Sequence, residues 1–267
     1  MQKDKAIGVF DSGIGGLTVV KSLMELMPNE NIVYFGDIAR IPYGTKSRAT
    51  IQKFAEQTVK FLLEQEVKAI IIACNTISAV AKEAVQSLAK DIPVIDVISA
   101  GTQSVQSFDN IGVIATPATI NSKAYSRAIH SYNQDAEVFS QSCGLFVPMI
   151  EEGFMYGVAP DAIAKEYLGY FDDKNIQALI LGCTHYPLIK DTISKSIATG
   201  VKLIDPATQA CIMLKECLED KNILNTQTEK SEYKFYVTDV PIKFKSIGEM
   251  FLKTQMDYLE IVNLENT

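Results

Sequence analysis

The sequence predicts an α/β fold with two pseudo-symmetric, doubly wound domains, whose mainly parallel sheets face a central cleft. Three observations lead to this prediction. Short apolar runs alternate with helix-length segments, the runs are rich in Ile and Val, and their pattern occurs twice along the chain. Nearly continuous apolar runs are typical of strands buried on both faces of a parallel sheet. Regular alternation of strands and helices favours right-handed crossover connections.

The expected elements can be assigned in chain order. The predicted strands are Ile7–Phe10, Ile32–Phe35, Ala69–Ala73, Val94–Val97, Ile111–Ala115, Val138–Ser140, Ala178–Leu181, Lys202–Ile204 and Tyr233–Val237. The predicted helices are Thr50–Glu64, Ser78–Ala89, Leu188–Ile197 and Lys245–Lys253. In the first helix the apolar residues form one stripe with Lys, Glu and Gln opposite, as in an amphipathic surface helix. The polar segment Glu219–Glu232 predicts a connecting loop.

Four short segments of the first half recur in the second half in the same order, at offsets of 104 to 109 residues. The matching pairs are Ile7–Phe10 with Ile111–Ile114, Val33–Phe35 with Val138–Ser140, Ala69–Cys74 with Ala178–Cys183, and Val94–Asp96 with Leu203–Asp205. Buried strands resemble one another, but a cysteine at the end of two equivalent strands favours a true repeat. We therefore predict a first domain of residues 1–97 with 211–267 and a second domain of residues 98–210.

Length and composition exclude several classes of protein. With 267 residues, of which 47% are hydrophobic and 21% charged, the chain is neither disordered nor collagen-like. Lys and Arg number 25 against 32 Asp and Glu, so the net charge of −7 offers no general attraction to nucleic acid or to an anionic membrane. Neither is expected as a partner. The first apolar run is too short for a signal peptide, and no run has the length of a membrane span, which predicts a cytoplasmic protein.

The cysteines and histidines predict neither disulfides nor a metal site. The five cysteines are odd in number, widely spaced and without a CxxC motif, as expected for free thiols in a reducing compartment. The two histidines show no zinc-binding spacing. Cys143, Cys211 and Cys217 are interpreted as residues without a function, since cysteine is commonly buried. His130 is expected at the surface.

Ligands of open α/β sheets bind outside the carboxyl ends of the strands, so the residues after each strand are candidates for function. The turn Asp11-Ser12-Gly13-Ile14-Gly15-Gly16 follows the first strand, and its glycines allow close approach of a ligand. Thr18 stands where a dinucleotide fingerprint has its last Gly, and the turn lacks the Lys of a P-loop. A plain strand-to-helix turn is the alternative, but an idle carboxylate at Asp11 would be costly there.

Two segments at the ends of equivalent strands contain the strongest candidates for catalytic residues. They are Cys74-Asn75-Thr76 and Cys183-Thr184-His185. A position before a helix N-terminus favours the thiolate, which is the reactive form of cysteine. The amide and hydroxyl groups that follow each cysteine can donate hydrogen bonds to a carboxylate. His185 is a candidate proton partner of Cys183.

The remaining polar candidates are weaker. Pro42–Thr45 is a turn sequence after the second strand, either a turn only or a source of backbone N–H groups for a ligand. In the segment Thr116–Thr119, either hydroxyl could serve only as a helix cap. For Glu151 and Glu152, a pair on the surface is the favoured interpretation.

Two thiols at equivalent positions point to a reaction with two bases. If the carboxyl strand ends of both domains face inward, Cys74 and Cys183 lie on opposite sides of one cleft. One nucleophile suffices for acyl transfer, whereas two opposed bases suit removal of a proton from one face of a carbon and return of a proton to the other. Such a reaction is a racemisation or epimerisation, in which each acid–base step contributes about 10²–10⁴-fold in rate.

Four motifs are together highly specific, although each alone would not be. They are Gly8–Val19, Pro42–Thr45, Ala73–Thr76 and Gly182–Leu188, with weaker matches at Thr116–Ile120 and Phe146–Glu151. These motifs closely resemble those of glutamate racemases, within the aspartate/glutamate racemase superfamily. The resemblance implies interconversion of L- and D-glutamate without pyridoxal phosphate, another cofactor or a metal. It also implies the supply of D-glutamate for peptidoglycan synthesis, and a homodimer.

By motif position, the resemblance implies roles for individual residues. The implied catalytic residues are Cys74, Cys183, Asp11, His185 and Glu151. The implied substrate-binding residues are Asp11, Ser12, Tyr43, Gly44, Asn75, Thr76, Thr119, Thr184 and His185. Asp11 would assist Cys74, whereas His185 and Glu151 would assist Cys183. Two alternatives stay open, a racemase for another amino acid such as aspartate and a non-catalytic amino-acid-binding protein.

Overall fold

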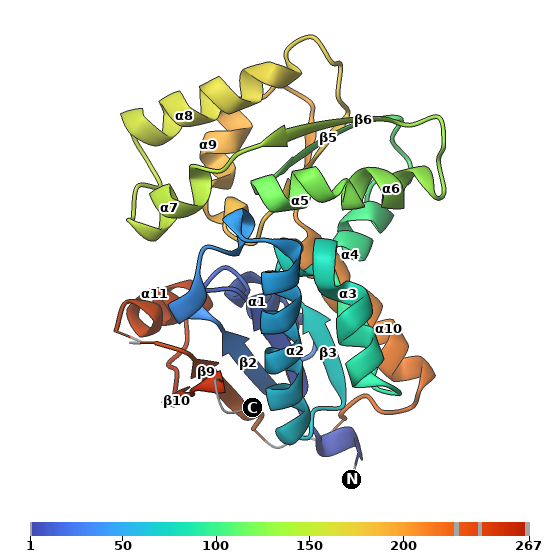
Figure 1. The fold of residues 1–267 in the computed structure, drawn as a ribbon, viewed down its shortest axis with the longest axis vertical. Helices are drawn as coiled ribbons and strands as arrows, with labels where there is room; N and C mark the ends of the chain where they lie inside the picture. The colour runs from blue at the N-terminus through green and yellow to red at the C-terminus, as the bar shows by residue number, and fades with distance from the viewer. Residues whose placement is uncertain (1, 227–229, 240–241, 265–267) are drawn as a thin grey trace.

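The computed structural model describes residues 2–226, 230–239 and 242–264, and it has two lobes that each contain one parallel sheet between helices (Figure 1). The first sheet has the order β10-β9-β2-β1-β3-β4 and the second the order β6-β5-β7-β8. The first sheet contains β1 (Ile7–Asp11), β2 (Ile32–Gly36), β3 (Ala69–Ile72), β4 (Val94–Asp96), β9 (Tyr233–Val237) and β10 (Tyr258–Ile261). The second contains β5 (Asn110–Ala115), β6 (Glu137–Ser142), β7 (Ala178–Gly182) and β8 (Lys202–Ile204).

The internal repeat in the sequence is a repeat in the topology. The order β2-β1-β3-β4 in the first sheet matches the order β6-β5-β7-β8 in the second. The register also matches, since Ile7 pairs with Ala69 in one sheet and Ile111 pairs with Ala178 in the other. The prediction of two α/β domains with parallel sheets is therefore confirmed, and each predicted strand is present with ends within two residues of those expected.

Helices cover both sheets and fill the junction between them (Figure 1). The α-helices are α1 (Leu17–Leu26), α2 (Arg48–Glu64), α3 (Asn75–Ala89), α4 (Val97–Gln103), α5 (Pro117–Ser122), α6 (Ala124–His130), α7 (Phe146–Glu151), α8 (Val158–Leu168), α9 (Lys190–Lys195), α10 (Pro206–Asp220) and α11 (Ile242–Leu252). Short 3₁₀ segments are η1 (Gln2–Asp4), η2 (Ile38–Arg40), η3 (Tyr43–Thr45), η4 (Gly169–Phe171) and η5 (Tyr186–Ile189). No described helix has the length and apolar character needed to cross a membrane.

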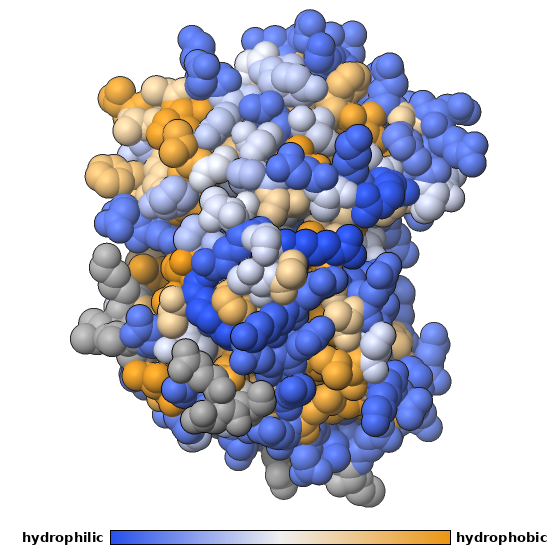
Figure 2. All heavy atoms as spheres, in the orientation of Figure 1, coloured by the Kyte–Doolittle hydropathy of each residue, from blue (hydrophilic) through white to orange (hydrophobic). Residues whose placement is uncertain are grey.

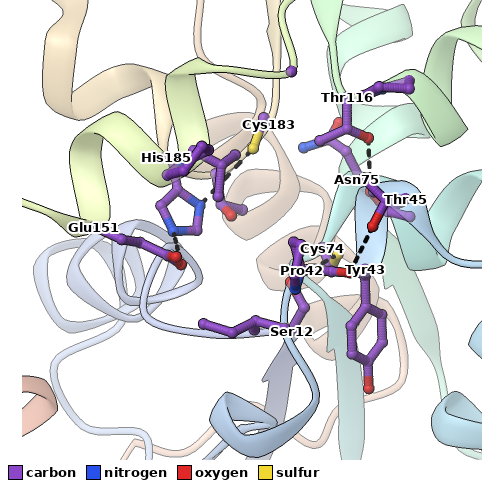
Figure 3. Close-up of a pocket in the computed structure, with 18 residues that line it drawn as sticks. Ser12, Pro42, Tyr43, Thr45, Cys74, Asn75, Thr116, Glu151, Cys183 and His185 are labelled. Carbon is purple, nitrogen blue, oxygen red and sulfur yellow. Dashed lines mark hydrogen bonds and ion pairs between the residues drawn. The ribbon is translucent and has the colours of Figure 1, made fainter.

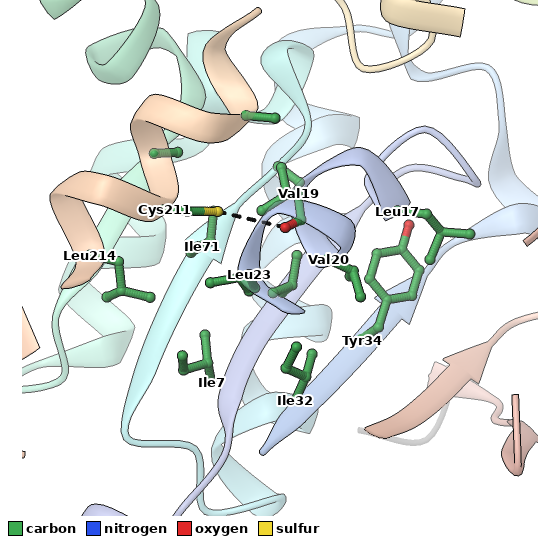
Figure 4. Close-up of a cluster of buried hydrophobic side chains, with 14 of the residues drawn as sticks. Ile7, Leu17, Val19, Val20, Leu23, Ile32, Tyr34, Ile71, Cys211 and Leu214 are labelled. Atoms are coloured by element: carbon green, nitrogen blue, oxygen red, sulfur yellow. Dashed lines mark hydrogen bonds between the residues drawn. The ribbon is translucent and has the colours of Figure 1, made fainter. Parts of the chain in front are cut away.

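The first sheet is buried on both faces, as its apolar strands predict. On one face Ile7 and Ile71 pack against Leu23 of α1 and Leu214 of α10 (Figure 4). On the other face Phe10 packs in a separate cluster with residues of α2 and α3. Burial of each such side chain contributes about 1.5–3 kcal/mol. This packing holds the carboxyl ends of β1 and β3 in fixed positions beside the second lobe.

Four details differ from the sequence-based expectations. Strand β10 was not predicted, because Tyr258–Ile261 is an edge strand with mostly exposed side chains. The predicted helix Leu188–Ile197 is divided into η5 and α9. Strand β4 ends before Val97, because the Asp96 carboxylate caps α4. The predicted loop at residues 219–232 begins two residues late, since α10 runs to Asp220, and its residues 227–229 lie outside the described part.

Helices α4 and α10 run across the predicted domain limits at residues 97/98 and 210/211. The two helices pack against each other and so join the lobes. The strands of residues 1–97 and 211–267 that the structure describes lie in the first sheet, and those of residues 98–210 lie in the second. The exact limits of the domains stay a prediction.

Candidate active site

A cavity of about 220 Å³ lies where the carboxyl ends of both sheets meet, and both lobes contribute to its wall (Figure 3). Most residues with a predicted role lie on this wall. They are Ser12, Tyr43, Gly44, Cys74, Asn75, Thr76, Glu151, Cys183, Thr184 and His185. The volume suits a small metabolite rather than a macromolecule. The topology therefore brings together residues that are up to 173 positions apart, as in the contact of Asp11 with Thr184.

Cys74 follows β3 and occupies the N-cap position of α3. Its thiol donates a hydrogen bond to Ser12 Oγ over 3.6 Å. Burial and then the negative charge of Asp11 raise the pKa of Cys74 to about 12, although hydrogen bonds from the Ile77 backbone and the Ser12 side chain lower it. The expected effect of the helix N-terminus is thus outweighed, and Cys74 is a neutral thiol at physiological pH.

Asp11 ends β1 and lies behind the cavity wall, only 1% exposed. Its Oδ2 atom accepts hydrogen bonds from the backbone of Gly16 at 2.7 Å and Gly13 at 3.4 Å, and from Thr184 Oγ1 at 3.4 Å. Its Oδ1 atom is buried without a hydrogen-bond partner in the described structure. Burial of a carboxylate oxygen without a hydrogen bond lowers the stability of the folded protein. A role of Asp11 in function would explain why such an oxygen is present here.

Cys183 follows β7 and lies beside an ion pair. His185 Nδ1 is 3.9 Å from Cys183 Sγ, and His185 Nε2 is 3.2 Å from Glu151 Oε1 (Figure 3). Burial lowers the pKa of His185, but hydrogen bonds and charge attraction from Cys183 and Glu151 together outweigh it and raise the pKa to about 10. The imidazole is therefore a cation at neutral pH, next to the second thiol. The interpretation of Glu151 as a surface residue is wrong, because α7 turns its carboxylate toward His185.

Hydrogen-bond donors lie between the two cysteines. The Oδ1 atom of Asn75 accepts a hydrogen bond from Tyr125 at 2.6 Å, which leaves the amide NH₂ group for the cavity. The hydroxyl of Thr76 is 2.9 Å from that of Thr116, which also lines the cavity. Together with Ser12 and Thr184, these groups form a polar lining suited to a carboxylate.

The segment from Pro42 to Thr45 forms part of the cavity wall. The Tyr43 hydroxyl points away from the cavity and donates a hydrogen bond to Asp37 (Figure 3). Gly44 is required there, because a Cβ atom would lie 2.7 Å from Thr116 Cβ. Tyr43 thus contributes its ring and backbone to the cavity and uses its hydroxyl to anchor the loop.

Some predicted residues lie elsewhere. Thr119 is behind the wall and touches the hydroxyls of Thr76 and Thr116, so it supports the lining without being part of it. Glu152 and His130 are exposed, as expected. Cys143 and Cys211 are core residues, also as expected. In the described parts of the chain, no group of His, Cys, Asp and Glu residues is arranged to hold a metal ion.

Thr116, a weaker candidate of the sequence analysis, lines the cavity and also caps α5. Sequence reasoning missed two residues that support the site, Asp37 and Tyr125. Asp37 anchors Tyr43, and Tyr125 anchors Asn75, but both act through tertiary contacts. Of these residues only Asp37 could have been found from the sequence, because it is a charged residue shortly after a buried strand.

A cavity with one thiol from each lobe and donors for a carboxylate in its wall is suited to α-proton exchange on an amino acid. In combination with the two-lobed α/β fold, it places this protein in the class of amino-acid racemases.

Comparison with known proteins identifies the family. Residues 7–214 match the Asp/Glu/Hydantoin racemase family, and the chain belongs to this family. It is 48% identical over 265 residues to the glutamate racemase of Neisseria meningitidis, covering 98% of each chain. The solved glutamate racemase of Francisella tularensis, in complex with D-glutamate, is 65% identical with a TM-score of 0.95, covering 99% of this chain and 100% of the other. The aspartate racemase of Picrophilus torridus, 17% identical with a TM-score of 0.59 over 80% of this chain and 94% of the other, shares the fold.

Proposed function

We propose that this protein is a glutamate racemase that interconverts L- and D-glutamate by proton transfer between its α-carbon and two cysteines, Cys74 and Cys183, without a cofactor. The observation that carries the proposal is that these two thiols, from equivalent strand ends of the two lobes, line one cavity. The similarity over the full length to proteins named glutamate racemase supports glutamate as the substrate.

The proposed reaction needs one thiolate and one thiol at a time. A thiolate takes the α-proton, and the electron pair of the C–H bond stays on the carbon. The opposite thiol then gives its proton to the other face of that carbon, so the product has the opposite configuration and the two cysteines have exchanged their protonation states. The reverse reaction uses the same steps in the opposite order.

The two cysteines have different surroundings, an imidazole beside Cys183 and the carboxylate of Asp11 near Cys74. The protonated His185, held by Glu151, has its Nδ1 atom 3.9 Å from Cys183 Sγ, where it can exchange a proton with this cysteine. Burial and the negative charge of Asp11 keep Cys74 protonated, with a pKa of about 12. We propose that the free protein holds Cys74 as the thiol. Asp11, with its unpaired Oδ1 atom, would accept the proton of Cys74 when the reaction runs from the other enantiomer.

Stabilisation of the carbanion is the larger task. Negative charge that develops at the α-carbon spreads into the α-carboxylate, where preorganised donors stabilise it most in the transition state. We propose that Ser12, Asn75, Thr76 and Thr184 hold the substrate in this way. Because these groups are already in place, little reorganisation is needed during the reaction.

Incubation of the purified, reduced protein with L-glutamate in deuterated buffer, without added cofactor, tests the proposal. Polarimetry and the NMR signal of the α-proton are followed together. We expect both signals to disappear, because racemisation through deprotonation introduces deuterium. Unchanged signals from folded protein would contradict the proposal. Loss of signal with L-aspartate but not with L-glutamate would instead assign the protein to another racemase of this family.

We also propose a cytoplasmic enzyme that supplies D-glutamate for peptidoglycan and acts as a homodimer. Figure 2 shows apolar surface over α7 and the start of α8, where Phe154, Tyr156 and Val158 are each more than half exposed. Exposed apolar groups of this kind are common at protein–protein contacts. Analytical ultracentrifugation tests this point, and a monomer at micromolar concentration would contradict the homodimer.

A further inference from the structure

Tyr125 of α6 reaches from the second lobe to the first residue after Cys74. Its hydroxyl donates a hydrogen bond to Asn75 Oδ1 over 2.6 Å, and both side chains are less than 5% exposed. Asn75 lines the cavity, whereas Tyr125 does not. The bond therefore joins the lobes directly behind the wall of the site.

The ring of Tyr125 lies in a slot that two glycines create. A Cβ atom on Gly101 of α4 would lie 3.2 Å from Tyr125 Cε1, and one on Gly182 of β7 would lie 3.1 Å from Tyr125 Cε2. These distances are shorter than ordinary carbon–carbon contacts, so larger residues would displace the ring. Gly182 directly precedes Cys183. The slot thus holds the hydroxyl in a fixed position relative to both cysteine-bearing segments.

The donor and acceptor in this bond have defined roles. Burial, followed by the negative charges of Asp96, Asp205 and Cys183, raises the pKa of Tyr125 well above its ordinary value. The phenol therefore keeps its proton throughout the working pH range and needs an acceptor, which Asn75 Oδ1 supplies. Once the amide oxygen is engaged, the NH₂ group is directed into the cavity.

We infer that Tyr125 is a positioning residue, which orients the Asn75 amide so that its NH₂ group rather than its oxygen meets the carboxylate of the substrate. The inference rests on the proposed function, since it concerns the binding of glutamate at that site. Without the hydroxyl, Asn75 is free to rotate, and its oxygen would then repel the carboxylate. The residue acts through Asn75 and does not touch the substrate.

The variant Tyr125→Phe tests the inference, because it removes only the hydroxyl and leaves the ring in its slot. We expect KM for both enantiomers to rise by about tenfold, with a smaller change in kcat, as for the loss of one hydrogen bond to a charged ligand. The matched control is Tyr236→Phe. Tyr236 also donates to a side-chain amide oxygen, that of Gln65 at 3.1 Å, but far from the cavity. Its loss should leave KM unchanged.

A double-mutant cycle separates positioning from general loss of structure. In an Asn75→Ala background, Tyr125→Phe should change KM by less than about twofold, because the group that it orients is absent. Asn75→Asp, with Tyr125 intact, keeps an acceptor for the hydroxyl but removes the NH₂ donors, and should raise KM at least as much as Tyr125→Phe. Thermal unfolding of each variant reports on the fold.

Three outcomes would overturn the inference: an unchanged KM in Tyr125→Phe, an unchanged KM in Asn75→Asp, or a full additional effect of Tyr125→Phe in the Asn75→Ala background. The wild-type protein, measured alongside, keeps the two hypotheses apart. Absence of glutamate turnover by the wild type would contradict the proposed function, whereas an active wild type with unaffected variants would contradict only the role of Tyr125.

Discussion

His185 Nε2 lies 3.2 Å from Glu151 Oε1, and this contact joins a helix of the second lobe to the segment that carries Cys183. The carboxylate is half-buried at 26% exposure, whereas the imidazole is almost fully buried. A buried imidazole alone would be neutral, since burial lowers its pKa. The contacts of His185 with Cys183 and with Glu151 together reverse this tendency, and so determine the charge beside one of the two thiols.

Replacement of Glu151 by Gln should therefore lower the pKa of His185 below its value of about 10. We expect the alkaline limb of the activity profile to move to lower pH and kcat near pH 8 to fall by about tenfold or more. The measurement is a pH–rate profile in both directions. Enantiomers have equal free energies, so kcat/KM stays equal in the two directions, and any asymmetry appears in kcat and KM separately. Glu152→Gln, the exposed neighbour, is the control, and equal profiles of both variants would contradict the prediction.

The contacts that raise the pKa of His185 also make stability depend on pH. The folded protein holds the proton of His185 up to about pH 10, whereas the unfolded chain releases it near the ordinary imidazole value of about 6.5. The stabilisation is therefore complete below pH 6.5 and is lost as the pH rises toward 10. Thermal unfolding between these pH values should show a falling midpoint, with a smaller decline in Glu151→Gln. A parallel decline in both proteins would assign the effect to other groups.

Removal of either thiol should abolish racemisation. Cys74→Ala and Cys183→Ala should each lower kcat by at least about 100-fold, because each cysteine serves one face of the substrate. The half-buried Cys217 lies on α10, away from the cavity, so Cys217→Ala is the control. Polarimetry with each enantiomer gives the rates. Turnover near that of the wild type in either active-site variant would refute the mechanism with two bases.

The anchor of the Tyr43 loop should affect stability. Buried Asp37 accepts hydrogen bonds from Arg40, Tyr43 and Thr238, the last of which follows β9 near the far end of the chain. In Asp37→Asn, an NH₂ group would face one of these donors, and the charge partner of Arg40 would be lost. We expect a loss of about 1–3 kcal/mol in the free energy of unfolding, together with a higher KM.

Urea unfolding measures this loss, with Asp173→Asn as the control. Asp173 also pairs with a cation, Lys174, but is 77% exposed. The control should change stability by less than about 0.5 kcal/mol. Equal losses in the free energy of unfolding for the two substitutions would contradict the prediction that the buried hydrogen bonds of Asp37 stabilise the fold.

Gly15 is the point where the first turn approaches the second lobe. A Cβ atom there would lie 2.3 Å from Thr184 Oγ1 and 2.8 Å from His185 Nδ1. Gly15→Ala should push these side chains aside and lower kcat/KM by more than about tenfold, with a loss of about 1–3 kcal/mol in stability from overpacking. Gly169→Ala, whose Cβ would have its nearest neighbour at 3.8 Å, is the control. An unchanged kcat/KM in Gly15→Ala would contradict this prediction, since it would show that the two lobes can move apart at this contact without loss of activity.

Local patterns in the sequence were enough to predict the buried strands, the repeat and the two cysteines. The buried strands Ile7–Phe10 and Ala69–Ala73 show as apolar runs because both faces of a parallel sheet are covered. Cys74 and Cys183 were found because strand ends are where such sheets bind ligands. Strand β10 could not be found in this way, because an exposed edge strand has no apolar pattern.

Other properties depend on contacts between residues that are distant in the chain. Residue type and local pattern did not separate Glu151 from its exposed neighbour Glu152, and only the resemblance to racemases gave Glu151 a role; the structure shows its contact with His185. The charge of His185 and the high pKa of the Cys74 thiol likewise arise from burial and from neighbouring charges, which no local pattern records. Residue types and their spacing thus specified which groups react. Only the packing of the two lobes set their protonation states, because electrostatic energies depend on distance and burial in space.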